Sequence, residues 1–248
     1  MRDSIRAVLV DLGHTLVYLN KPWEDVSEAN MRSVYAYLKG ADVKADLNKF
    51  SATFARALED ASSKSDPFKI EIPMEEIISR VMRKFGIRNP YPEFVQGAME
   101  AYYQPELQSW KLFPDAIQAL TSIDKDGYAL GLISNAKSDW AVHAILKENG
   151  IEKFFRVILT SALLRIRKPR PEIFIKALDA LKVRPREATF VGDSLDADVI
   201  GARNVGIHAI YLRRYLPEHD LAVDPEATAT NLTEVVKIIQ GWTDDQTL

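Results

Sequence analysis

Residues 190–202 read FVGDSLDADVIGA, a short apolar run followed at once by three aspartates. Phe190 and Val191 are typical of a buried strand, and Gly192 marks the place where such a strand ends. Asp193 follows the strand directly, and Asp198 lies five positions later. Because an open parallel sheet binds its ligands beyond the carboxyl ends of its strands, this stretch predicts both a fold class and the position of a site.

Other apolar runs of strand length are spaced along the chain, with helical patterns between them. The expected strands are residues 5–10, Tyr128–Ile133, Val157–Thr160, Ala188–Val191 and Ile207–Leu212. Alternation of strands and helices predicts an α/β fold with a doubly wound parallel sheet that is covered on both faces.

Residues 17–109 have a different pattern. Their apolar residues recur at helical spacing, most clearly from Met74 to Phe85, and we expect no strand among them. The sequence therefore predicts an all-helical module of about four helices, inserted after the first strand. On this interpretation residues 1–16 and 110–248 form the α/β core.

Composition excludes several classes of protein. The 248 residues include no cysteine, so disulfides, zinc–thiolate sites and thiol nucleophiles are excluded. A net charge of −3 gives no sign of a nucleic-acid-binding surface. No apolar run reaches the roughly 18 residues of a membrane span, and the first residues lack the pattern of a signal peptide. We expect a cytoplasmic protein with no membrane or nucleic-acid partner; the sequence predicts no oligomeric state.

Polar residues end the other strands as well. Asp11 ends the first, Ser134 and Asn135 follow the second, and Lys168 follows the third. We expect them to meet Asp193 at one edge of the sheet. Clustered carboxylates repel one another unless a cation lies between them, and oxygen ligands favour Mg²⁺. A carboxylate can also attack phosphorus, and a lysine and a hydroxyl can bind the phosphoryl oxygens.

Four segments in this order resemble the motifs of the haloacid dehalogenase (HAD) superfamily. That family has a strand ending D-x-D-x-T, a strand ending in Ser or Thr, a lysine often followed by Pro-x-Pro-x-Ile-Phe, and Gly-Asp-Ser-x-x-x-Asp-x-x-Gly-Ala. The corresponding segments here are VLVDLGHTL (8–16), GLISNA (131–136), RKPRPEIF (167–174) and the stretch at 190–202. The insertion is similar to the family's helical cap in place and length.

The resemblance implies a magnesium-dependent phosphohydrolase of small phosphorylated metabolites that works through an aspartyl phosphate on Asp11. It implies catalytic roles for Asp11, Lys168 and Thr15, with Thr15 orienting the nucleophile loop. The implied magnesium ligands are Asp11, the Gly13 carbonyl, Asp193 and Asp198. The implied phosphoryl-binding residues are Ser134, Asn135 and Lys168.

Gly13 departs from the family pattern. The family phosphatases have an aspartate there, which protonates the leaving group and later activates water. Three hypotheses follow: His14 substitutes for it; a cap residue delivers the proton, with Lys21 and Trp23 in the connecting loop; or no acid is used and the substrates have good leaving groups.

Other functions stay open. Gly13 is also compatible with a weakened binding or regulatory protein, or with a metal-independent haloacid dehalogenase, although Asp193 favours phosphoryl transfer. A bacterial receiver domain has its acid pair early in the chain, whereas here the acid cluster comes last. A dinucleotide-binding oxidoreductase requires Gly-x-Gly-x-x-Gly after a strand, which this sequence lacks.

Overall fold

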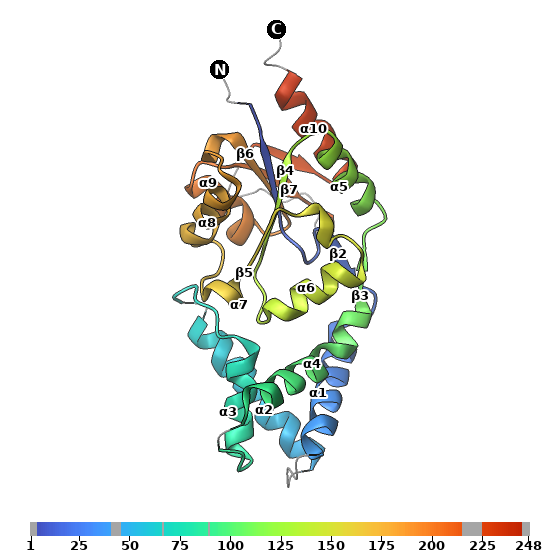
Figure 1. Ribbon diagram of the computed structural model, residues 1–248, viewed down its shortest axis with the longest axis vertical. Coiled ribbons are helices and arrows are strands. Elements are labelled where there is room, and N and C mark those ends of the chain that lie inside the picture. The colour runs from blue at the N-terminus through green and yellow to red at the C-terminus, as the bar shows by residue number, and fades with distance from the viewer. Residues whose placement is uncertain (1–3, 41–45, 66, 89, 215–224, 245–248) are drawn as a thin grey trace.

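The computed structural model describes residues 4–40, 46–65, 67–88, 90–214 and 225–244 (Figure 1). Its main sheet has six parallel strands in the order β5-β4-β1-β6-β7-β8. The strands are β1 Ala7–Val10, β4 Ala129–Ser134, β5 Val157–Thr160, β6 Ala188–Gly192, β7 His208–Leu212 and β8 Ala227–Ala229. This confirms the predicted α/β sheet and its five expected strands; β8 was not predicted.

The strands form here because both of their faces are buried. β1 lies in the middle of the sheet, between β4 and β6, and all four of its residues are buried. Ala7 and Leu9 pack in one apolar cluster with α8 and α9 residues, while Val8 and Val10 pack in another with α5 and α10 residues. Such continuous apolar runs are typical of a doubly covered parallel sheet.

Helices cover both faces of the sheet (Figure 1). The core helices are α5 Ala116–Lys125, α6 Asp139–Glu148, α7 Ser161–Leu164, α8 Pro171–Leu181, α9 Gly201–Asn204 and α10 Leu232–Asp244. Short 3-10 turns span Glu152–Phe154 and Pro185–Glu187, and a π-helix, η3, spans Leu195–Ile200. Within the described ranges, no helix has both the length and the apolar character needed to cross a membrane.

The helical insertion comprises α1 Trp23–Lys39, α2 Leu47–Ser65, α3 Met74–Lys84 and α4 Pro92–Ser109. Two three-residue strands, β2 Val17–Leu19 and β3 Trp110–Leu112, flank it and pair antiparallel. The four helices were predicted. The expectation that residues 17–109 contain no strand is wrong for β2, and β3 was not predicted either, because three residues are too few to show a period of two. The division into residues 1–16 with 110–248 and 17–109 stays a prediction.

The loop before α3 attaches the insertion to the core a second time. Residues 69–71 lie along residues 165–167, with an antiparallel bridge between Ile70 and Ile166, and Met74 N donates to Lys137 O. Backbone hydrogen bonds run from Glu71 N to Arg165 O (3.2 Å) and from Arg167 N to Lys69 O (2.9 Å).

The side chain of Glu71 strengthens this attachment. Its carboxylate is fully buried and contacts Lys137 Nζ at 3.2 Å, Arg167 Nη1 at 2.8 Å and Ser161 Oγ at 2.8 Å. These four residues are called the Glu71 cluster below. Three of them belong to the core, so the buried carboxylate joins α2–α3 to the sheet.

Candidate active site

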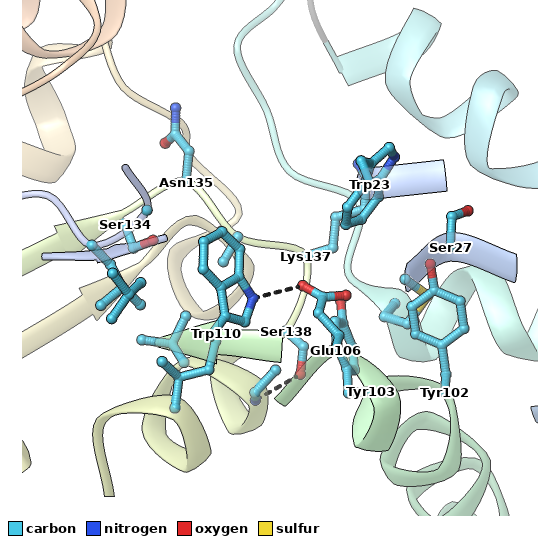
Figure 2. A pocket seen from close by; sticks show the side chains of 18 of the residues that line it. Trp23, Ser27, Tyr102, Tyr103, Glu106, Trp110, Ser134, Asn135, Lys137 and Ser138 are labelled. Carbon is cyan, nitrogen blue, oxygen red and sulfur yellow. Dashed lines mark hydrogen bonds between the residues drawn. The ribbon is translucent and has the colours of Figure 1, made fainter. Parts of the chain in front are cut away.

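A cavity of about 600 Å³ lies between the carboxyl edge of the sheet and the helical insertion (Figure 2). Asp11, Gly13, Ser134 and Asn135 line it from the core. The insertion side is mostly apolar and aromatic, and includes Trp23, Leu58, Met74, Tyr102 and Tyr103. A largely apolar hollow with a few polar groups is the usual form of a small-molecule site.

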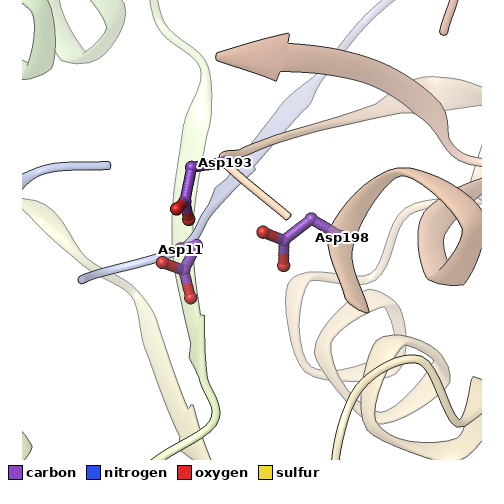
Figure 3. A group of neighbouring side chains, drawn as sticks. All are labelled: Asp11, Asp193 and Asp198. Carbon is purple, nitrogen blue, oxygen red and sulfur yellow. The ribbon is translucent and has the colours of Figure 1, made fainter. Parts of the chain in front are cut away.

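Three carboxylates converge at the carboxyl edge of the sheet, and one of them, Asp11, lines the cavity (Figure 3). Asp11 follows β1, Asp193 follows β6 and Asp198 lies in η3. Because β1 and β6 are neighbours in the sheet, their carboxyl ends bring Asp11 and Asp193 side by side. Each of the three residues offers one oxygen, and these oxygens all lie within 4.8 Å of one another.

The local structure after β6 sets the position of Asp198. Ser194 caps the segment, accepting a hydrogen bond from Ala197 N at 3.1 Å, and Ser194 N donates to Asp198 Oδ2 at 3.0 Å. Gly192 ends the strand directly beside that carboxylate, and a β-carbon at this position would overlap it. A residue without a side chain is therefore needed at Gly192 for Asp198 to reach the site.

Lys168 lies between two of the acids. Its Nζ atom is 2.6 Å from Asp11 Oδ1 and 2.7 Å from Asp198 Oδ1, and it donates to Ile133 O at 2.9 Å. Asn135 fixes the lysine backbone from both sides: Lys168 N donates to Asn135 Oδ1 at 2.8 Å, and Asn135 Nδ2 donates to Lys168 O at 3.0 Å. The Asn135 side chain is therefore engaged in positioning Lys168.

Thr15 and Ser134 are both buried at this edge. Thr15 lies in the loop after β1, and its Oγ1 atom is 3.5 Å from Asp193 Oδ1. Ser134 is the last residue of β4 and faces the cavity (Figure 2). All the residues singled out from the sequence thus lie at one edge of the sheet.

The electrostatics of the cluster favour an added cation. Burial raises the pKa of Asp11, with Lys168 opposing it, and burial also raises the pKa of Asp193 and, to about 6, that of Asp198. Burial lowers the pKa of Lys168, but Asp11 and Asp198 outweigh this effect and the net shift is upward. One buried lysine faces three carboxylates, so the donor set fits a hard divalent ion such as Mg²⁺.

Trp110 occupies the space in front of Gly13. The indole ring lies 3.7 Å from the point where a β-carbon on Gly13 would stand. His14, at φ 58°, packs its ring edge-on against the same indole with 5.9 Å between ring centroids. Lys21 lies in an adjoining hollow with His14 and Trp23.

Comparison with known proteins identifies the family. A family model described as haloacid dehalogenase-like hydrolase matches residues 42–212. The chain belongs to the haloacid dehalogenase-like hydrolases. It is 30% identical over 215 residues to a glyceraldehyde 3-phosphate phosphatase of Methanopyrus kandleri, across 85% of this chain and 84% of that one.

Solved HAD structures share the fold. A 2-haloacid dehalogenase from Pseudomonas syringae superposes with a TM-score of 0.71, and a HAD phosphatase from Thermococcus onnurineus with 0.65. Each is 23% identical, and each comparison covers 96% of this chain and 99% of the other. This HAD-like hydrolase therefore shares the fold of both structures over 96% of its chain.

Among the polar residues of the cavity that sequence analysis missed in this HAD-like hydrolase, Glu106 has the most defined surroundings. Glu106, on α4, is half-buried, and its carboxylate accepts hydrogen bonds from Trp110 Nε1 at 3.2 Å and from Asn30 Nδ2 at 3.0 Å. Burial raises its pKa. The available signal was its spacing, because Glu106 follows Tyr102 and Tyr103 by four and three positions and so extends a buried helix stripe with a carboxylate.

Proposed function

We propose that this hydrolase is a magnesium-dependent phosphatase of small phosphorylated metabolites that forms an aspartyl phosphate on Asp11. The observation that carries the proposal is the position of Lys168 Nζ, 2.6 Å from Asp11 and 2.7 Å from Asp198, with Asp193 in the same cluster. A nucleophile that lines the cavity, a fixed positive charge and a carboxylate set for a divalent ion meet at one edge of the sheet. The phosphatases among its relatives support the same reaction class.

Asp11, Asp193, Asp198 and the backbone carbonyl of Gly13 are the proposed magnesium ligands. When bound, the ion offsets negative charge on the acids and on the phosphoryl group. Lys168 supplies a second positive charge, and the Ser134 hydroxyl and the backbone amide of Asn135 donate to the phosphoryl oxygens. Thr15, which lies against Asp193, keeps the loop that carries Asp11 in place.

The reaction then has two displacements. A carboxylate oxygen of Asp11 forms a bond to phosphorus while the bond from phosphorus to the ester oxygen breaks, and the released oxyanion then takes up a proton from water. Water then attacks phosphorus, the bond to Asp11 breaks, and inorganic phosphate and the free carboxylate result. In the first step Lys168 stabilises the charge that builds on the phosphoryl oxygens.

We further propose that residues 17–109 act as a cap over this edge. The cap contributes the apolar side of the cavity, which would exclude water while the first displacement occurs. Because Gly13 has no side chain to protonate the leaving group, we expect aryl and acyl phosphates to react faster than alkyl phosphates.

The test is phosphate release from an aryl phosphate, with Mg²⁺ and with chelator, by the wild type and by Asp11→Asn. Activity that requires Mg²⁺ and is lost in Asp11→Asn supports the proposal. A folded, magnesium-loaded wild type that releases no phosphate from aryl, acyl or alkyl phosphates contradicts it. Halide release from a 2-haloacid without metal would instead assign dehalogenation.

A further inference from the structure

The cavity contains a second acidic position, well separated in sequence from the strand ends. Glu106 lines the cavity from α4, among the rings of Tyr102, Tyr103 and Trp110 (Figure 2). The only other glutamate of the lining, Glu59 on α2, is exposed. Glu106 is thus a half-buried carboxyl among aromatic rings on the insertion side of the cavity.

Such a placement is costly for the fold. The hydrogen-bond partners of Glu106 are neutral N–H groups of Trp110 and Asn30, which offset the burial of its charge only in part. Buried acids in clefts that gain little from the fold are candidates for ligand contact.

The hydrogen bonds also fix the direction of the carboxylate. Trp110 Nε1 binds one oxygen and Asn30 Nδ2 binds the other, so the group cannot rotate freely. A carboxylate has about four lone-pair sites, and these two bonds use two of them. The remaining capacity is available to a hydrogen-bond donor inside the cavity.

We propose that Glu106 selects the organic part of the substrate, and that the substrate is a phosphomonoester with an aromatic or aliphatic body that bears a hydroxyl or amino group facing Glu106. This rests on the phosphatase activity proposed above. The phosphate would lie at Asp11, the apolar body would contact the aromatic wall, and the donor would reach the carboxylate. A cavity of about 600 Å³ has room for a body larger than a three-carbon chain.

A matched pair of esters tests this inference. 4-(Hydroxymethyl)phenyl phosphate and 4-methylphenyl phosphate differ by one hydroxyl that is insulated from the ester oxygen. The wild type should prefer the hydroxymethyl ester by about 10- to 100-fold in kcat/KM, the range expected for a hydrogen bond to a charged group. Glu106→Gln, which keeps the shape but not the charge, should reduce this ratio to a few-fold. 4-(Aminomethyl)phenyl phosphate distinguishes an ammonium donor from a hydroxyl.

The control is Glu100→Gln, because Glu100 lies on the same helix, bonds Gln96 and is not part of the cavity lining. It should leave the ratio unchanged. Equal use of the two esters by the wild type, or an unchanged ratio in Glu106→Gln, overturns the inference.

Binding provides a readout that needs no turnover. Calorimetry with Asp11→Asn and with Asp11→Asn/Glu106→Gln gives the affinity of each ester in the absence of reaction. A hydroxyl-dependent affinity that disappears with Glu106→Gln supports the role of Glu106 even if the wild type releases no phosphate. That pattern would separate a failure of the proposed reaction from a failure of the proposed selectivity.

Discussion

The indole ring of Trp110 stands 3.7 Å from the place that a β-carbon on Gly13 would occupy, which is an ordinary van der Waals distance. The backbone of Gly13 does not have a positive φ, so its conformation is open to residues other than glycine. An aspartate can therefore be introduced at this position without a clash at Cβ and without a strained backbone. The missing general acid can be restored by a single substitution.

Gly13→Asp should raise kcat for alkyl phosphates and have little effect on aryl phosphates, whose leaving groups depart without a proton. General acid catalysis contributes roughly 10²–10⁴-fold, which sets the upper bound of the gain. Steady-state kinetics on a series of esters of rising leaving-group pKa provides the measurement. Gly13→Asn is the control, and an equal gain in that variant would rule out proton transfer as the cause.

Replacing Lys168 by methionine should abolish phosphate release and weaken the fold. The substitution leaves Asp11 and Asp198 buried without the cation that contacts both. Removal of one partner from a buried ion pair costs about 3–5 kcal/mol. Urea denaturation in chelator measures this, with Lys176→Met on the exposed side of α8 as the control. Equal stability of the two variants would contradict the charge balance described here.

Glu71→Ala should lower the free energy of unfolding by about 3–5 kcal/mol, because it leaves Lys137 and Arg167 partly buried without their common partner. Glu76 is a matched control, since its ion pairs with Arg80 and Arg165 lie at the surface. Glu76→Ala should cost at most about 1 kcal/mol. If chemical denaturation gave similar losses of unfolding free energy for both variants, the buried Glu71 cluster would stabilise the fold no more than a surface ion pair does.

The pH dependence of stability reports on Glu106. Burial raises its folded pKa above the usual 4.5, while Trp110 and Asn30 oppose the shift. Its contribution to stability is therefore fully present below pH 4.5 and is lost as the pH rises through the folded pKa. Glu106→Gln removes this loss, so the unfolding free energy of the variant relative to the wild type should increase as the pH rises across that window.

Denaturation in chelator at several pH values tests the slope. The nearby Tyr102 and Tyr103 have pKa values raised by burial and stay neutral in this range, so they add no slope. For Glu100→Gln, the unfolding free energy relative to the wild type should not increase with pH across this window. A difference for Glu106→Gln that is constant with pH would mean that the carboxyl is better solvated than its position indicates.

The sequence predicts the group of polar residues at the carboxyl edge of the sheet because the signals for that group are local. Asp11, Ser134 and Asp193 each end or follow an apolar strand, and the parallel topology brings strand ends together without further information. The side chain of Asn135 is different: its place against the Lys168 backbone depends on how two loops meet.

Glu106 and Glu71 were missed for the same reason. Each is an ordinary acid in the sequence, and its importance comes from the surface that its segment faces after folding. Glu71 is important because it forms ion pairs with Arg167 and Lys137, which are far away along the chain. Helical periodicity locates a buried stripe, but it does not identify the partner of a polar residue within that stripe.

The two attachments of the insertion have a mechanical consequence. β2 and β3 join it to the core on one side, and residues 69–74 with the Glu71 cluster join it on the other (Figure 1). A rigid rotation of α1–α4 away from Asp11 must therefore break a buried group of charges as well as bend a strand pair. The β2–β3 pair can bend as a hinge, whereas the contacts of the Glu71 cluster must first break, so the strength of that cluster limits how often α1–α4 can move away from Asp11.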